Sequence, residues 1–199
     1  MATTNTDKAV KLTRRDEFLQ KLVELLETNP QERISTAILA RACGVSEAAL
    51  YRQFSNKAEM YDQLLNFIDD SLLGVLKTIR ESTTHDSVAK ILAMMNVLLE
   101  YVEVNKGLAR ILTGHALTGE DPRLLERLRQ IHTKIENMLK QAYKDAILER
   151  RFPADFNAAG RAELVYGFIV GRWLHFVMSN FTTRAAGISP LVLAPFTLP

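Results

Sequence analysis

Apolar residues recur along this chain at intervals of three and four, the spacing of helices that bury one face, and strand-like alternation is absent from the sequence. The first predicted helix covers about residues 12–28, and Asn29-Pro30 ends it because the residue before a proline avoids the helical conformation. Further helices are predicted at about residues 36–43, directly after Ser46, and at 57–79, 87–104, 108–113, 123–151 and 154–180. The pattern therefore predicts an all-α protein.

Breaks in this pattern divide the chain into a small N-terminal unit and a larger body. We expect a basic, flexible arm at residues 1–11 and a three-helix head at residues 12–56. A helical body at residues 57–186 follows, and its last two long helices are expected to serve dimerisation. The tail at residues 187–199 holds three of the chain's six prolines and receives no assignment.

The segment at residues 44–57, GVSEAALYRQFSNK, has the layout of the second half of a helix-turn-helix. Gly44 supplies a tight turn, Ser46 caps a short helix, and Phe54 closes that helix on its inner side. Small residues at the front of the helix would let its backbone enter a DNA major groove. Three capped helices that contact no DNA have the same spacing, and the spacing alone leaves that alternative open.

The side chains expected to contact DNA come from this short helix and from the neighbouring helix starts. Exposed polar side chains can reach phosphates or base edges, and backbone N–H groups at a helix N-terminus favour a phosphate. The predicted DNA-binding residues are Arg14, Arg15, Ser35, Thr36, Val45, Ser46, Glu47, Ala48, Ala49, Tyr51, Arg52, Gln53 and Lys57.

The net charge of the 199-residue chain is only +2, so bulk basicity does not indicate nucleic-acid binding. The cations are instead concentrated near the motif. Residues 33–57 hold four cations and one anion, and residues 8–15 hold Lys8, Lys11, Arg14 and Arg15 without an acid. We therefore expect DNA binding to depend on local charge.

Composition argues against several other classes of protein. The single cysteine, Cys43, allows neither an intramolecular disulfide nor a cysteine-based metal cage, and the four histidines lack metal-ligand spacing. No catalytic triad order or paired-carboxylate pattern is recognisable, so we expect neither an enzyme nor a bound metal. The N-terminus lacks an apolar signal core, and Glu163, Arg172 and His175 interrupt the most apolar late stretch. A cytoplasmic protein is expected.

The stretch from Arg33 to Lys57 resembles the DNA-binding head of the TetR family of bacterial regulators, whose signature combines GVS with LYR-x-F-x-x-K. Within that family, RISTAILARACGVSEAALYRQF, residues 67–72 and the body block at residues 107–117 resemble nucleoid occlusion factors of the SlmA type. The resemblance covers roughly residues 12–150. It implies a TetR-like fold and a cytoplasmic, nucleoid-associated homodimer that binds palindromic double-stranded DNA. It further implies contact with the division protein FtsZ, inhibition of ring assembly over the nucleoid, and no cofactor.

The resemblance also implies a face of the fourth and fifth helices that takes the FtsZ tail, with Phe67, Asp70, Val97 and Asn105 as its residues. This sequence departs from the expected pattern on that face. It carries Val75, Glu100 and Val104, where basic or small residues are expected. In the head, Gln53 stands where the family usually has histidine.

Two glycines one helical turn apart, Gly167 and Gly171, would let another helix approach closely. The pattern fits a dimer interface and packing inside one subunit equally well. Dimerisation itself is expected because two-fold DNA sites require two heads. The predicted interface residues are Leu128, Ile135, Gly167, Gly171 and Trp173.

Two other functions remain open at this stage. One is a ligand-responsive TetR-type repressor, in which a small molecule in the body moves the heads apart. The other is a helical adaptor that has lost DNA binding. Packing in the body distinguishes a ligand-responsive repressor from a nucleoid occlusion factor, because its aliphatic residues either fill the interior or line a ligand cavity. The residues concerned are Met94, Met95, Leu98, Leu99 and Ile111.

Overall fold

A computed structural model describes residues 13–29 and 33–198, and within these ranges the chain is helical without a strand. The predicted all-α fold class is confirmed. The basic arm expected at residues 1–11 lies outside the described residues. The helices of the first half are α1 (Arg14–Thr28), α2 (Thr36–Ala42), α3 (Glu47–Tyr51), α4 (Lys57–Ile68), the π-helical segment η1 (Asp69–Leu73), and α5 (Gly74–Glu81). The helices of the second half are α6 (Ser87–Val104), α7 (Lys106–Leu112), the 3-10 segment η2 (His115–Leu117), α8 (Pro122–Leu148), α9 (Ala158–Met178) and α10 (Pro190–Thr197).

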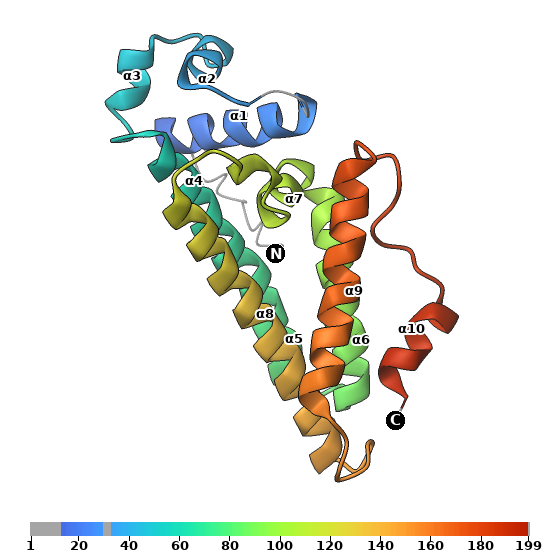
Figure 1. Ribbon diagram of the computed structural model, residues 1–199. Coiled ribbons are helices and arrows are strands. Elements are labelled where there is room, and N and C mark those ends of the chain that lie inside the picture. Colours follow the sequence, from blue (N-terminus) through green and yellow to red (C-terminus); the bar gives the residue numbers. More distant parts are fainter. Residues whose placement is uncertain (1–12, 30–32, 199) are drawn as a thin grey trace, which may run out of the picture.

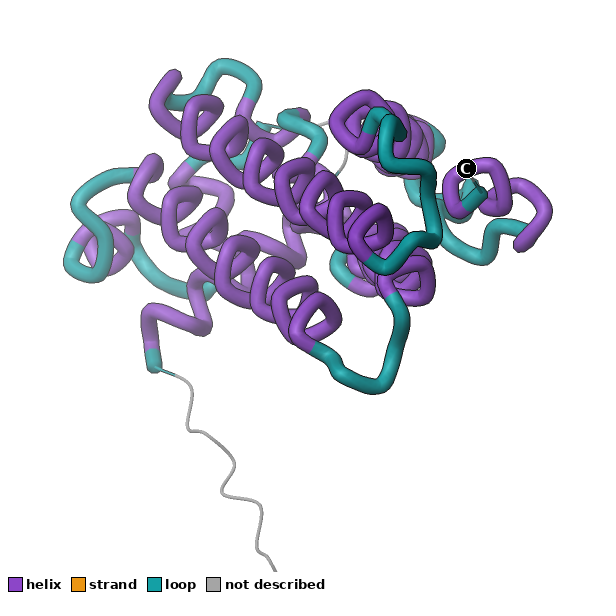
Figure 2. Tube along the Cα trace, turned by 90° about the horizontal axis from the view of Figure 1, so that it is seen from below, coloured by secondary structure: helices purple, strands orange, loops and turns teal. Residues whose placement is uncertain are grey.

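The head, α1–α3, occupies one end of the molecule, and α4 and α8 lead away from it (Figure 1). Helix α7 lies directly beneath α1, so the head rests on the body. Seen from below, the long helices of the body lie side by side, with α10 at their outer edge (Figure 2). This arrangement leaves α2 and α3 at the far end of the molecule, clear of the body.

One continuous apolar core joins the head to the body. Phe18, Leu22 and Leu26 form the buried stripe of α1 that the sequence pattern predicts. In the body, Trp173 of α9 is fully buried, and its indole Nε1 donates a hydrogen bond to the Leu98 carbonyl of α6 at 2.8 Å. Burial of this apolar area is the main stabilising contribution to such a fold.

The helix expected at residues 57–79 is interrupted. The π-helical segment at Asp69–Leu73 inserts one extra residue, which rotates the side chains that follow it relative to a regular helix. The Ser71 hydroxyl donates to the Phe67 carbonyl at 2.6 Å and lies 3.0 Å from the Tyr101 hydroxyl of α6. These contacts hold the bulge against the body.

The tail left unassigned by the sequence contains α10, although Pro195 lies inside it. Contacts with the body hold this short helix in place. The Tyr143 hydroxyl donates to the Phe196 carbonyl at 2.6 Å, and the Phe196 ring packs on Phe168 with centroids 5.1 Å apart. Arg161 donates to the Leu198 carbonyl at 3.0 Å. Tertiary packing has therefore overridden a local helix-breaking signal.

Within the two described ranges, none of the helices combines the length and the apolar character that a bilayer span requires.

Candidate DNA-binding surface

Helices α2 and α3 form the tight pair that the motif predicts. Gly44 adopts a φ of +66°, and the Val45 amide donates to the Ala40 carbonyl at 3.0 Å, which closes the turn. The Ser46 hydroxyl accepts a hydrogen bond from the Ala49 amide at 3.3 Å, so Ser46 caps α3 as predicted. The equivalent bond from the Ile38 amide to Ser35 starts α2.

Helix α3 turns one side inward and the other to solvent. Leu50 and Phe54 are buried, which anchors the helix on the head. Glu47, Ala48, Tyr51, Arg52 and Gln53 are exposed on the outer side. The structure thus exposes most of the side chains predicted to contact DNA on the outer side of α3, the helix that is expected to enter a major groove.

A hydrogen-bond network links the starts of α2 and α3 on this surface. The Thr36 hydroxyl donates to a Glu47 carboxylate oxygen at 2.6 Å, and the Tyr51 hydroxyl donates to Thr36 Oγ1 at 3.5 Å. Thr36, Glu47 and Tyr51 are therefore neighbours although they come from two helices. The network links both ends of α3 to the start of α2.

Arg15 is held inside the head by several partners. Its guanidinium donates to the Gln53 carbonyl at 2.6 Å and to the Gln63 side chain at 3.0 Å. Arg15 Cζ also lies over the Phe54 ring, 4.4 Å from its centroid. It also pairs with Glu59. These contacts hold α1 against the end of α3, so Arg15 stabilises the position of α3 in addition to its predicted DNA contact. Arg14 is exposed one residue earlier.

The Glu59 carboxylate organises the turn between α3 and α4. It accepts hydrogen bonds from the Ser55 amide at 2.6 Å and the Ser55 hydroxyl at 2.8 Å. These bonds, with the Arg15 guanidinium, lower the pKa of Glu59 to about 2. The carboxylate therefore stays ionised throughout the physiological range.

Lys57 is the first residue of α4 and follows α3 closely in the chain, but its ammonium already has an internal partner. Lys57 Nζ lies 2.6 Å from Glu120 Oε1, and the same oxygen lies 3.0 Å from Arg33 Nε. The Glu120 side chain is only 6% exposed. Sequence reasoning missed Glu120, because no local pattern links residues that are 63 positions apart.

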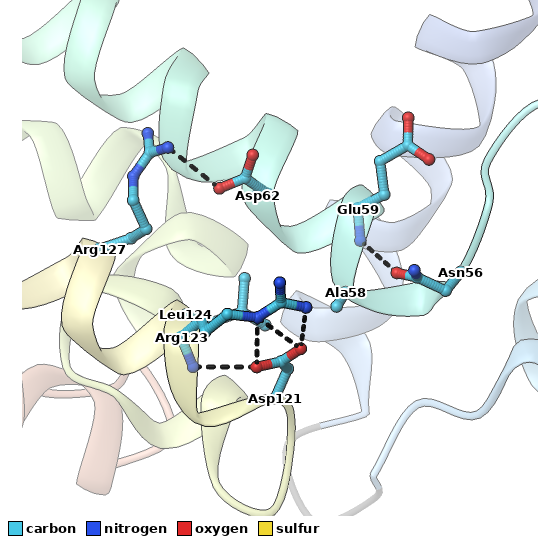
Figure 3. A pocket seen from close by; sticks show the side chains of 8 residues that line it. All are labelled: Asn56, Ala58, Glu59, Asp62, Asp121, Arg123, Leu124 and Arg127. Atoms are coloured by element: carbon cyan, nitrogen blue, oxygen red, sulfur yellow. Dashed lines mark hydrogen bonds and ion pairs between the residues drawn. The ribbon is translucent and has the colours of Figure 1, made fainter.

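A charged groove opens between the first turns of α4 and α8, close to the head (Figure 3). Its volume is about 360 Å³. Four of its five charged side chains form two pairs: Arg123 Nη2 lies 2.6 Å from Asp121, and Arg127 Nη1 lies 3.3 Å from Asp62. The fifth, Glu59, pairs with Arg15 of α1. Hydrogen bonds from Arg123 lower the pKa of Asp121 to about 2. Ion pairs at the starts of α4 and α8 therefore line this groove.

Two of the residues predicted to bind a partner protein line one shared groove. Phe67 is 56% exposed, and it lines a groove of about 340 Å³ together with Asn105. Helices α1, α4 and α7 form its walls, and its other lining residues are Asp16, Leu19, Gln20, Val23, Leu64 and Leu108. Asp70 is exposed one turn further along, and Val97 is half-buried on α6.

The predicted dimer-interface residues require a correction. Ile135 and Trp173 are 0% exposed, so their side chains lie in the core of a single chain, and Leu128 is 6% exposed at the groove between α7, α8 and α9. Gly167 and Gly171 are exposed, in contrast, and a Cβ placed on either glycine meets no atom within 4 Å. Exposed apolar side chains flank these glycines on α9, namely Leu164, Leu174 and Met178.

Five aliphatic residues of α6 and α7, expected to fill the interior or line a cavity, are packed inside the body. Met94, Met95, Leu98, Leu99 and Ile111 are all buried in one apolar cluster. The groove in Figure 3, the groove beside Phe67, and a third one of about 500 Å³ between α7, α8 and α9 are lined by other residues. These five aliphatic residues therefore pack in the core and line none of the three grooves.

Comparison with protein families finds two matches. Residues 18–64 match the bacterial regulatory proteins of the tetR family, and residues 85–188 match the tetracyclin repressor-like C-terminal domain of the SlmA-like type. Nucleoid occlusion factor SlmA of Shewanella baltica strain OS155 is 41% identical over 174 residues, which cover 87% of this chain and 88% of that protein. The SlmA protein of Shewanella sp. strain MR-4 is 40% identical over the same lengths.

Solved structures support the fold. The fatty acid degradation regulator FadR of Bacillus halodurans superposes with a TM-score of 0.72 at 16% identity, covering 94% of each chain. The ketosteroid transcriptional regulator KstR2 of Mycobacterium tuberculosis gives a TM-score of 0.70 at 17% identity, covering 93% of each chain. At such low identity, the likeness concerns the arrangement of helices alone.

Proposed function

From its membership of the TetR family of bacterial regulatory proteins and, within it, of the SlmA type of nucleoid occlusion factors, we propose a function for the chain. It works as a homodimer that binds palindromic chromosomal DNA and inhibits FtsZ ring assembly over the nucleoid. Membership of this family makes it a DNA-binding regulator and not an enzyme. We further propose that it resides in the cytoplasm, associated with the nucleoid.

The observation that carries the DNA-binding part is the surface of α3. A capped helix projects from the head with Tyr51 and Arg52 exposed, and buried Leu50 and Phe54 hold it from behind. Arginine and tyrosine side chains supply phosphate and base contacts in such helices. The backbone N–H groups at the start of α2, beside Thr36, favour a phosphate.

The groove beside Phe67 is the proposed FtsZ-binding site. Apolar side chains line most of it, and Asp16, Gln20 and Asn105 provide polar groups at its edges. A peptide that places an apolar side chain in the groove would cover Phe67. Val104, which is 81% exposed, stands on this face where a basic or small residue is expected, so we infer a contact that is mainly apolar and only weakly dependent on salt.

The proposed dimer uses the exposed stripe of α9. Gly167 and Gly171 leave room for a second helix to approach, and Leu174 and Met178 supply apolar area beside them. A two-fold axis that runs beside this stripe, roughly parallel to α9, would place two heads at the same end of the dimer, as a palindromic site demands.

The packing of the aliphatic residues of α6 and α7 in the core supports this function over a ligand-responsive repressor that binds its ligand among them. Mapping of bound DNA across the chromosome tests the choice. Many scattered palindromes, depleted near the replication terminus, are expected for a nucleoid occlusion factor. A single site beside its own gene would overturn the proposal and favour a local repressor. A purified chain that stays monomeric and ignores palindromic duplexes at low salt would contradict DNA recognition altogether.

A further inference from the structure

The body block at residues 107–117, which the sequence comparison singles out, lies against the head. Gly107 of α7 packs on α1 so closely that a Cβ on Gly107 would fall inside van der Waals contact with the Val23 carbonyl oxygen. Only glycine permits this approach, because any side chain would push backbone against backbone. The block therefore sets the distance between α7 and α1.

Arg110, one turn further along α7, binds the end of α1. Its side chain is buried, and Nη1 donates to the Leu26 carbonyl at 2.9 Å and to the Asn29 carbonyl at 3.1 Å. The last carbonyls of a helix lack partners inside the helix and carry partial negative charge. As far as the described residues extend, the last turn of α1 has no basic side chain of its own. Arg110 thus supplies from the body the cation that α1 lacks.

Glu120 provides a third contact at a different place. It pairs with Arg33, which precedes α2, and with Lys57 at the start of α4. Arg33 also donates to the Gly119 carbonyl. The body thus contacts the head at three separate places: the middle of α1, its C-terminal end, and the edge of the α2–α3 pair.

We propose that Gly107, Arg110 and Glu120 form a clamp that fixes the angle of the head on the body and thereby sets the half-site spacing that the dimer accepts. This inference rests on the proposed DNA-binding homodimer. Half-sites repeat with the helical turn of DNA, and successive base pairs are about 3.4 Å apart, so a small tilt of each head misplaces α3 by a whole base pair. Arg110 is accordingly a positioning residue, which acts on DNA through α1.

The first test uses the full-length Arg110→Met variant and palindromes that the native chain has enriched from a random duplex pool. Affinity is measured for a series of duplexes in which the two half-sites are moved apart or together by one or two base pairs. We expect the native chain to prefer one spacing by at least tenfold, and Arg110→Met to reduce this ratio at least fivefold. The salt dependence should stay unchanged, because phosphate contacts are retained. Arg110→Lys should restore part of the preference.

Gly107→Ala is expected to act differently, because its methyl group displaces α1 instead of releasing it. The half-site spacing that gives the highest affinity should change, while the preference for that one spacing stays as strong as in the native chain. The exposed Arg129 on α8 offers a matched control, and Arg129→Met should keep the native preference. A second readout needs no DNA: spin labels on Ala42→Cys in a Cys43→Ser background report the distance between the two heads. That distance distribution should broaden in Arg110→Met and shift in Gly107→Ala.

Native spacing preference and native head-to-head distances in both variants would overturn the clamp while leaving DNA binding intact. Absence of duplex binding by the native chain would instead contradict the proposed function. If Arg110→Met fails to fold, Gly107→Ala and Arg110→Lys still decide the question through the same two measurements.

Discussion

The ammonium of Lys57 and the carboxylate of Glu120 lie 2.6 Å apart, and they join the first turn of α4 to the loop before α8. The same carboxylate binds Arg33, so one nearly buried anion holds two cations at the edge of the proposed DNA-binding surface. Lys57 was expected to pair with a phosphate. In this arrangement a phosphate has to compete with Glu120 for it.

Replacing Glu120 by Gln should release both cations toward DNA. The salt dependence of binding is expected to steepen by about one to two units of log–log slope, since each additional phosphate contact contributes about 0.9. Affinity for random duplexes should rise. Titrations between low and moderate salt give the slope directly. Glu126→Gln, which alters an exposed ion pair on α8, is the control, and an unchanged slope in Glu120→Gln would show that Lys57 and Arg33 stay away from DNA.

Arg52→Gln should weaken binding to all duplex sequences and flatten the salt slope by about one unit, because Arg52 is exposed on the outer side of α3 and is expected to bind a phosphate. Fluorescence anisotropy with a palindromic and a random duplex measures both effects. Lys144→Gln removes an exposed cation from the other half of α8 and should change neither quantity. Equal affinities for Arg52→Gln and the native chain would refute the placement of α3.

Phe67→Ala is expected to weaken FtsZ binding at least tenfold and to leave DNA binding unchanged. The ring is more than half exposed, so the cost to the stability of the chain should stay below about 1 kcal/mol. Pull-down and anisotropy with purified FtsZ provide the measurement. Leu148→Ala removes another exposed apolar side chain, 81% exposed, at the far end of α8 and serves as the control. FtsZ binding that survives Phe67→Ala would place the partner on another face.

His132 should make the protein less stable in mild acid. Burial lowers the pKa of His132, whose Nε2 lies 2.9 Å from the Leu112 carbonyl and whose Nδ1 lies 2.8 Å from the Tyr166 hydroxyl. Below the ordinary histidine pKa of 6.5, His132 is protonated in the unfolded chain and stays neutral in the folded chain. The free energy of unfolding therefore falls as pH falls. The loss is at most about 1.4 kcal/mol per pH unit.

Urea unfolding at pH 7 and pH 5 tests this dependence. Carboxylates with a lowered pKa, such as Glu59, lose their contribution only below their ordinary value of about 4.5, outside this window. His132→Gln can keep hydrogen bonds to both partners without titrating, so its unfolding midpoint should vary less between the two pH values. An equal pH dependence in native chain and variant would assign the effect to other groups.

The head could be predicted from the sequence because its signals are local. The left-handed Gly44 and the Ser46 cap depend on residues within one turn, and the structure confirms both. The apolar stripe of α1 is equally local. Short-range rules of this kind need no knowledge of what packs against the segment.

The remaining features depend on contacts between distant segments. The pairing of Glu120 with Lys57 joins loops that no periodicity relates, and α10 persists despite Pro195 because Tyr143 and Phe168 hold it. Trp173 was assigned to a dimer interface from its position near two glycines, but it lies on the opposite side of α9 in the core. A one-dimensional pattern separates apolar from polar faces and cannot tell which apolar face meets a second chain.

The glycines of α9 offer the sharpest test of the dimer. A Cβ at Gly171 meets nothing within 4 Å in one chain, so Gly171→Leu should not disturb the fold and should raise helix stability by about 0.5–1 kcal/mol. In a dimer that uses close helix approach, the same side chain would separate the two helices. Sedimentation should therefore give a dissociation constant at least tenfold higher, and DNA affinity for palindromes should fall in parallel. Gly74→Leu, at an equally open glycine on α5, should leave the dimer unchanged. A Gly171→Leu chain that remains fully dimeric would move the interface away from this stripe.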